Sequence, residues 1–213
     1  MIRLINLFFI IFFLLSAKAY SLIEIDITRG NLDPLPIAVS PLFQDDNSKR
    51  NSFNEHKIEN VGSEISLVVE NNLKISGLFN PLSKEAFLQK PDIAHLKPRF
   101  EDWALIKAQA LITGKVPIED KKLKVEFRLW DILAGREMMA LAFTTVPSNW
   151  RRVGHIISDK VYERLTGEKG YFDTRIIYVS EEGPKTARVK KLAIMDLDGF
   201  KTKYLTLGNE LFL

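Results

Sequence analysis

The chain has 213 residues, a formal net charge of +3 and no cysteine, so it is long enough for one domain with its own core. The lack of cysteine excludes a disulfide framework, a thiol nucleophile and a thiolate metal site. The three histidines, His56, His95 and His155, lie far apart in the sequence. This spacing argues weakly against a zinc centre or a histidine-based triad, and we expect no cofactor and no metal.

The first nineteen residues follow the order of a secretory signal peptide. A positively charged start precedes residues 4–15, which are apolar except for Asn6, and Ala17-Lys18-Ala19 fits the small-x-small cleavage pattern. The apolar run is shorter than the roughly 18–20 residues that a membrane-spanning helix needs, and an uncleaved anchor is the alternative. We expect export and cleavage after Ala19. Cleavage would leave 28 basic against 27 acidic residues, which removes most of the argument for an anionic partner.

Residues 20 to about 170 carry the alternating pattern of an α/β domain. Residues 23–27 alternate apolar and polar side chains, which predicts a strand with one solvent-facing side, and 36–43 is a second strand candidate. Helical spacing predicts a helix over 58–73 that Gly77 ends. The residues expected on its buried side are Val61, Ile65, Val68, Val69 and Leu73.

Three further strands, over 108–116, 123–132 and 138–146, are separated by short turns and predict a meander. A second long helix is expected from Asn149 to about Leu165, with Ser148 as its N-cap and Gly167 at its end. Its buried stripe is expected to consist of Trp150, Val153, Ile157, Val161 and Leu165.

The pattern changes again near Arg175. Residues 176–179, 192–195 and 204–206 predict short strands without an intervening helix, and 196–199 predicts a turn. Three short strands bury little core by themselves, so they resemble part of a repeat whose neighbours are missing. We expect three parts, listed here in chain order: a signal peptide (1–19), an α/β domain (20–170) and an unfinished β unit (171–213).

Two groups of residues could carry chemistry. His155, Ser158 and Asp159 share the second long helix, but a catalytic triad must converge, and adjacent helix positions point about 100° apart. A surface hydrogen bond or ion pair is therefore the preferred interpretation. The stretch from Asp196 to Gly199 begins like a calcium loop but lacks the further ligands of an EF-hand, so a β-turn is expected.

Glycine and basic clusters point to ordinary structural roles. Gly167-Glu168-Lys169-Gly170 lacks the spacing of a phosphate loop and is expected to end the helix. The basic clusters at 121–124 and 151–152 lack the interleaved aromatic residues of a nucleic-acid surface. We expect both to lie on solvated turn and helix surfaces.

The strand at 23–27 has two possible uses, because it follows the cleavage site closely. It can remain in its own sheet, or it can detach and pair with the edge of another protein's sheet through backbone hydrogen bonds. Both interpretations stay open on these residues.

The assembled segments resemble the TolB family of the Tol–Pal system of Gram-negative bacteria. Residues 23–32 and 34–39 resemble the mature start of the family, and 78–82 resembles the segment after its first helix. The most specific similarity is Trp150-Arg151-Arg152-Val153-Gly154-His155 with the later stretch from 158 to 179, which includes Leu-Thr-Gly and Thr-Arg-Ile.

The resemblance implies a non-enzymatic periplasmic adaptor. It implies an N-terminal α/β domain with a mixed β-sheet packed by two main helices, followed here by an incomplete β-propeller blade. The family links TolA, an inner-membrane-anchored partner, to Pal, the peptidoglycan-associated lipoprotein, for outer-membrane integrity and constriction during cell division. A full member has a six-bladed propeller with repeated Trp-Ser-Pro-Asp-Gly-type segments, which these 213 residues lack. We therefore expect a fragment of a longer product, or a natural truncation, without the Pal-binding surface.

The TolA contact that the resemblance implies maps onto the start of the mature chain. The alternatives are a stand-alone periplasmic binding module, or a small-ligand receptor or enzyme, which would need convergent polar residues in an apolar pocket. The residues of the implied TolA contact are Ser21, Leu22, Ile23, Glu24, Ile25, Asp26, Ile27, Thr28, Arg29 and Gly30.

Overall fold

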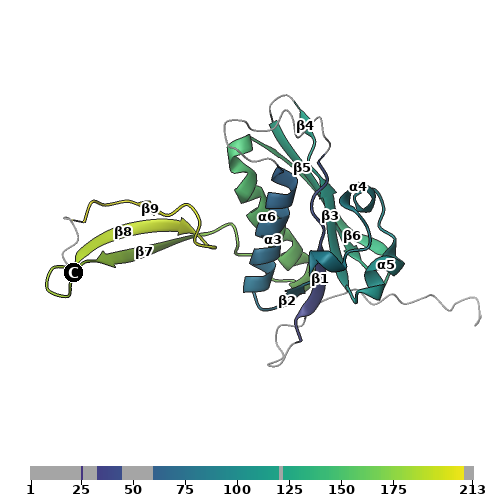
Figure 1. Ribbon diagram of the computed structural model, residues 1–213, viewed down its shortest axis with the longest axis horizontal. Coiled ribbons are helices and arrows are strands. Elements are labelled where there is room, and N and C mark those ends of the chain that lie inside the picture. The colour runs from purple at the N-terminus through teal and green to yellow at the C-terminus, as the bar shows by residue number, and fades with distance from the viewer. Residues whose placement is uncertain (1–24, 26–32, 45–59, 120–121, 209–213) are drawn as a thin grey trace, which may run out of the picture.

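The computed structural model describes residues 25, 33–44, 60–119 and 122–208. A six-stranded sheet with helices on both faces forms the larger part, and a three-stranded sheet projects from it (Figure 1). The expected signal peptide lies outside the described residues. Within them, no helix is both long and apolar enough to cross a membrane.

The larger sheet is mixed, as the family resemblance implied. β1 lies next to the edge strand β2 and pairs in parallel with β2 on one side and with β3 on the other. β3, β5 and β6 then form the expected antiparallel meander, and the two-residue β4 pairs with the start of β5. The bounds are β1 (Leu35–Val39), β2 (Phe79–Pro81), β3 (Ala110–Lys115), β4 (Ile118–Glu119), β5 (Lys122–Asp131) and β6 (Arg136–Thr145).

Two long helices, α3 (Val61–Ile75) and α6 (Trp150–Thr166), lie side by side on one face of this sheet (Figure 1). The Asn60 side chain caps α3 by accepting a hydrogen bond from the Ser63 amide at 3.0 Å. Gly167 ends α6 in the left-handed conformation at φ 75°, where a side chain would be strained. All five residues expected on the buried side of α3 are buried.

The start of α6 differs from the prediction. Ser148 was expected as the N-cap, but a 3₁₀ turn, η2 (Pro147–Asn149), leads into the helix and Asn149 occupies the cap without a side-chain hydrogen bond. Pro147 favours this turn because its ring fixes φ near the helical value and it needs no amide partner. Trp150 is only partly buried, whereas the other four residues of the predicted stripe are buried.

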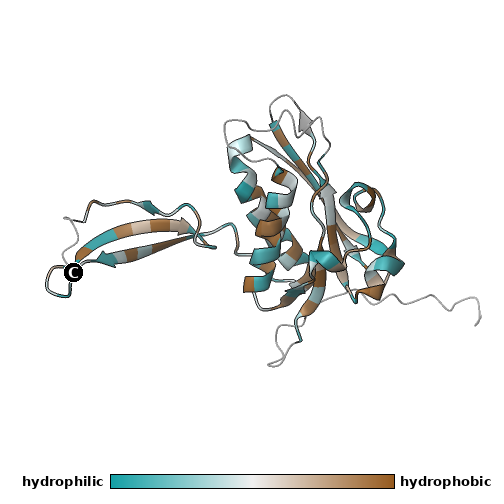
Figure 2. Ribbon diagram, in the orientation of Figure 1, coloured by the Kyte–Doolittle hydropathy of each residue, from teal (hydrophilic) through white to brown (hydrophobic). Residues whose placement is uncertain are grey.

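Side chains on the two faces of the sheet enter separate cores. Ile37 and Val39 point toward α3 and α6, whereas Ala38 belongs to the smaller core on the opposite face, as the period of a strand requires. Two short helices, α4 (Pro91–Ala94) and α5 (Phe100–Leu105), cover that opposite face together with the 3₁₀ turn η1 (Lys84–Ala86). Figure 2 shows apolar residues concentrated where these layers meet.

The second sheet contains β7 (Arg175–Glu182), β8 (Val189–Asp196) and β9 (Lys203–Tyr204) in antiparallel order. The turn predicted at 196–199 is confirmed, since the Gly199 amide donates to the Asp196 carbonyl at 2.9 Å. Ala193 is the one buried apolar residue among the described residues of these strands, while Ile177 is 61% exposed. This sheet therefore has almost no core of its own, as expected, and the boundary at residue 171 stays a prediction.

Replacing Ile157 with alanine should cost about 2–5 kcal/mol of unfolding free energy, because Ile157 is buried in the main core and leaves a cavity. Ile156 is the matched control: the same residue type one position along α6, only partly buried. Urea denaturation of both variants measures the difference. Equal losses would contradict the packing of α6 on the sheet.

Candidate functional site

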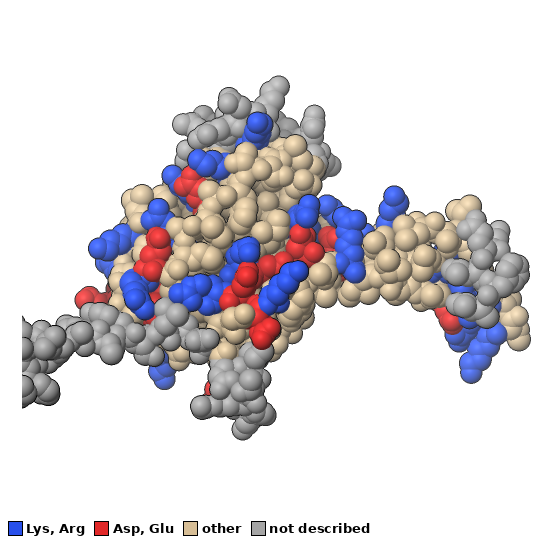
Figure 3. Space-filling model, turned by 180° about the vertical axis from the view of Figure 1, so that it is seen from behind, with Lys and Arg blue, Asp and Glu red and all other residues tan. Residues whose placement is uncertain are grey.

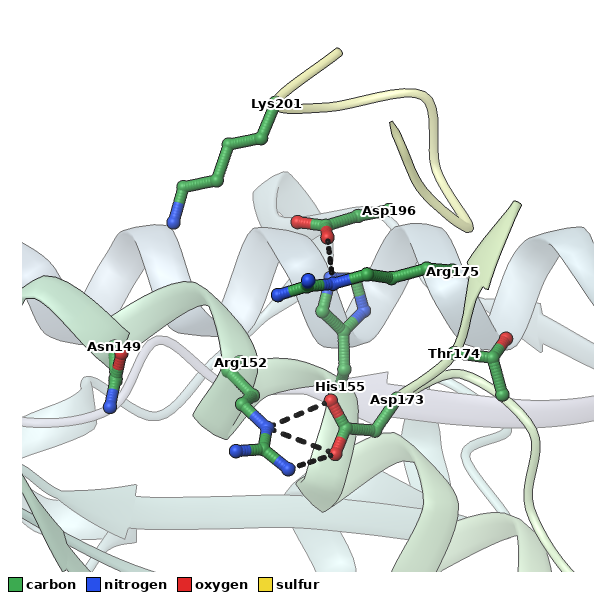
Figure 4. Close-up of a pocket in the computed structure, with 8 residues that line it drawn as sticks. All are labelled: Asn149, Arg152, His155, Asp173, Thr174, Arg175, Asp196 and Lys201. Carbon is green, nitrogen blue, oxygen red and sulfur yellow. Dashed lines mark hydrogen bonds and ion pairs between the residues drawn. The ribbon is translucent and has the colours of Figure 1, made fainter. Parts of the chain in front are cut away.

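A polar pocket of about 350 Å³ lies where α6 meets the second sheet. The first turns of α6 form one side, and the segment entering β7 and the turn after β8 form the others (Figure 4). Its walls carry both charges, unlike the largely apolar cavities that bind most small ligands. The lining residues are Asn149, Arg152, His155, Asp173, Thr174, Arg175, Asp196 and Lys201.

Ion pairs cross this junction. Arg151 of α6 pairs with Asp198, whose side chain is only 2% exposed, and the Arg151 guanidinium lies 3.9 Å from the centre of the Phe200 ring. Arg152 makes three hydrogen bonds to Asp173, because Nε lies 3.1 Å from both carboxylate oxygens and Nη2 lies 3.0 Å from Oδ2. This contact raises the pKa of Arg152. The prediction that 151–152 is a solvated surface is therefore wrong for Arg151, which anchors the second sheet to α6.

Charges elsewhere on the molecule are mixed. Figure 3 shows basic and acidic side chains interleaved on the side of the protein opposite to that of Figure 1. In the basic cluster predicted at 121–124, the Lys124 ammonium lies 2.9 Å from a Glu126 carboxylate oxygen. This hydrogen bond lowers the pKa of Glu126. A surface of alternating sign gives no extended positive field for a nucleic-acid backbone.

A buried polar network joins the two long helices. His155 is 3% exposed, and its Nδ1 lies 2.9 Å from Asn72 Nδ2 of α3. The same Asn72 nitrogen lies 3.0 Å from Ser158 Oγ, and Ser158 donates to the Gly154 carbonyl at 2.9 Å. Burial lowers the pKa of His155. His155 and Ser158 were expected at the surface, but the close contact of the helices buries both.

Asp159 faces away from this network and holds the segment that follows α6. Its two carboxylate oxygens accept hydrogen bonds from the Phe172 amide at 2.6 Å and the Asp173 amide at 3.2 Å. Gly170 makes this approach possible, because a Cβ there would lie 2.4 Å from the Asp159 Cα. The candidate triad therefore does not assemble, and the enzyme alternative loses the residues proposed for it.

The expected TolA-contact segment is described at one residue only. The Ile25 amide donates to the Leu165 carbonyl at 2.7 Å, and Ile25 packs, partly buried, against the main core. Leu165 lies in the last turn of α6, where carbonyls lack a partner within the helix. Ile25 is not part of a strand. The other nine residues of the segment lie outside the described part of the chain, so the TolA contact stays a prediction.

Several residues of this junction were missed by the sequence interpretation. Asn72 was not singled out in the sequence, although its side chain is buried at 1% exposure. Asp196 and Asp198 were recognised as part of a turn, but nothing in the sequence pattern placed them beside His155. Such contacts join residues far apart in the chain. The packing of α6 against α3 creates those of Asn72, and the packing of α6 against the second sheet creates those of Asp196 and Asp198.

Comparison with known proteins places this architecture in a family. The family model of the TolB amino-terminal domain matches residues 23–138. The chain belongs to the TolB family. The resemblance to this family is thus confirmed. The match lies mainly over the six-stranded sheet, α3 and the short helices.

Two relatives extend the match. The chain is 75% identical over 210 residues to the Tol-Pal system protein TolB of Pelagibacter ubique, which covers 99% of this chain and 47% of that protein. The crystal structure of TolB from Acinetobacter baumannii is similar with a TM-score of 0.66 and 25% identity, covering 82% of this chain and 39% of that one. The chain thus spans about half the length of the curated relative.

Replacing Asp159 with alanine should free the segment between α6 and β7, because two amide donors lose their acceptor. The expected loss is about 1–3 kcal/mol of unfolding free energy, with faster hydrogen exchange at the Phe172 and Asp173 amides. Asp159→Asn keeps one oxygen and should lose less. Unchanged exchange at both amides in the alanine variant would show that Asp159 does not hold this segment.

Proposed function

We propose that this chain is the amino-terminal part of a periplasmic adaptor of the Tol–Pal system, which links TolA to Pal for outer-membrane integrity and constriction during cell division. The observation that carries the proposal is the 75% identity over 210 residues to a protein named for that system. The aligned region covers 99% of the chain, so it includes both the α/β part and the strands of the second sheet.

The polar groups of α6 support an adaptor rather than an enzyme. Ser158 is fully buried and bonded to the helix carbonyl of Gly154, and Asp159 is engaged by backbone amides. A nucleophile must be reachable by substrate and activated by an adjacent base. An adaptor needs exposed segments and sheet edges instead.

The segment Ser21–Gly30 is the proposed TolA contact. Its alternating side chains suit pairing with the edge of another sheet, where backbone hydrogen bonds provide affinity and register. A partner that takes the backbone of the whole segment competes with the bond from the Ile25 amide to the Leu165 carbonyl. The cost of releasing one hydrogen bond, about 0.5–1.5 kcal/mol, is small beside the bonds that a full strand forms.

The Pal contact belongs to the propeller in this proposal. The described residues hold three strands, β7, β8 and β9, of the blade that the family resemblance implies. Their apolar residues, such as Ile177 and Val179, are exposed and suit packing against further β-structure. Export by the segment 1–19, with cleavage after Ala19, would bring the protein to the compartment where both partners meet.

Deleting Ser21–Gly30 should abolish TolA binding while the α/β part stays folded, because that part has its own core. A variant with the same ten residues in scrambled order keeps length and charge and should also fail to bind. Calorimetric titration with TolA measures affinity, and circular dichroism checks the fold. A synthetic peptide of residues 21–30 should compete with the intact chain, and unchanged affinity of the folded deletion variant would refute the assignment.

A further inference from the structure

Three side chains that can ligate a metal converge at the wall of the polar pocket between α6 and the second sheet. His155 comes from α6, Asp196 from the end of β8, and Asp198 from the turn that follows. One ligand atom of each lies within 4.8 Å of the others. Residues that are distant in the sequence are thus gathered into a cluster of one imidazole and two carboxylates.

We propose that His155, Asp196 and Asp198 bind a divalent transition-metal cation of the Zn²⁺ class. The inference rests on the geometry of this cluster and does not depend on the Tol–Pal assignment. A bound cation would connect α6 directly to the second sheet. It would add a coordinate link to the Arg151–Asp198 ion pair that already joins them.

The state of the His155 ring supports a ligand at this position. The side chain is 3% exposed, yet Nε2 has no hydrogen-bond partner within the described part of the chain. A buried polar atom left unpaired costs free energy. Figure 4 shows the ring pointing from α6 toward the side of the pocket that carries Asp196. A cation at Nε2 gives this nitrogen the partner that it lacks.

The carboxylates of Asp196 and Asp198 have neighbouring groups that can orient them for metal binding. Asp198 has Arg151 on Oδ2 and the Phe200 amide on Oδ1 at 3.2 Å, and such outer contacts orient ligating groups. The Asp196 carboxylate is held more weakly. Its ion pair is with Arg175, whose Nε lies 3.8 Å from Oδ1 and whose side chain is 71% exposed. An exposed ion pair of this length is weak, so a dication can displace Arg175.

Asn72 is the positioning residue for the ring. Ligation through Nε2 places the remaining proton on Nδ1, so Asn72 must present its carbonyl oxygen there. An exchange of the amide oxygen and nitrogen leaves the heavy atoms in place. It puts the oxygen 2.9 Å from His155 Nδ1 and 3.0 Å from Ser158 Oγ. The His155 Nδ1–H can donate to it, whereas the single Ser158 hydroxyl proton would have to turn from the Gly154 carbonyl to do so.

The donor set selects the class of cation. Calcium prefers six to eight oxygen ligands, whereas one imidazole with carboxylates suits Zn²⁺, Co²⁺ and related ions. Three protein ligands leave at least one position for water, and the adjacent pocket of about 350 Å³ has room for it. Zn²⁺ and Co²⁺ alone are therefore the appropriate probes.

The test uses the full chain after removal of metal with a chelator. Calorimetric titration with Zn²⁺ should show binding that Asp196→Asn weakens by about tenfold or more, as expected for a lost ligand or a disturbed ligand shell. Asp173→Asn is the matched control, because Asp173 lines the same pocket but pairs with Arg152 outside the cluster. Co²⁺ should give visible absorption bands in the wild type that Asp196→Asn alters and Asp173→Asn leaves unchanged.

A measurement on the wild-type protein tests the proposal even if the variants do not fold. Addition of Zn²⁺ should shift the ring proton resonances of His155 in an NMR spectrum, while those of His95, which is hydrogen-bonded to the Pro91 carbonyl, stay in place. The proposal is overturned by an unshifted His155 ring at saturating Zn²⁺. It is equally overturned if Asp196→Asn binds as the wild type does, or if Asp173→Asn loses as much affinity.

Discussion

The close crossing of α3 and α6 at Gly154 is the contact on which the other features of this structure depend. A Cβ on Gly154 would lie 2.8 Å from the Val68 Cγ1 of α3, closer than packed side chains tolerate. Only at this separation can Asn72 reach both His155 and Ser158. The crossing therefore fixes the buried polar network of Asn72, His155 and Ser158, and with it the orientation of the His155 ring.

Helix α6 then connects the main core, the segment that follows it and the second sheet. Its apolar side packs on the sheet, Asp159 holds the segment that leaves it, and Arg151 holds the turn after β8. Its last turn offers the Leu165 carbonyl to Ile25. Ile25, the described residue of the segment proposed for TolA, and the cluster proposed for a cation thus lie near opposite ends of one helix. A partner at either end acts on an element already fixed by the core.

The sequence predicted local elements well because local physics decides them. Gly167 and the spacing from Val61 to Leu73 placed the long helices, since helix ends and buried faces follow from nearby residues. Arg151 was misjudged because its burial depends on Asp198, a residue of another sheet. His155 was placed at the surface for the same reason. The partners of both residues are brought close only by tertiary packing, which no periodicity in the sequence encodes.

The histidine count illustrates this limit. Three scattered histidines argued against a zinc centre because sequence motifs for metals gather several ligands on one element. Here one ligand of the proposed cluster lies on a helix, and the other two lie in and beside a β-turn. Asp196 and Asp198 can form a β-turn and also serve as metal ligands, because the turn keeps their two carboxylates close together. Whether such a cluster forms is decided by the ion pair and ring contact of Arg151, which hold the turn against α6.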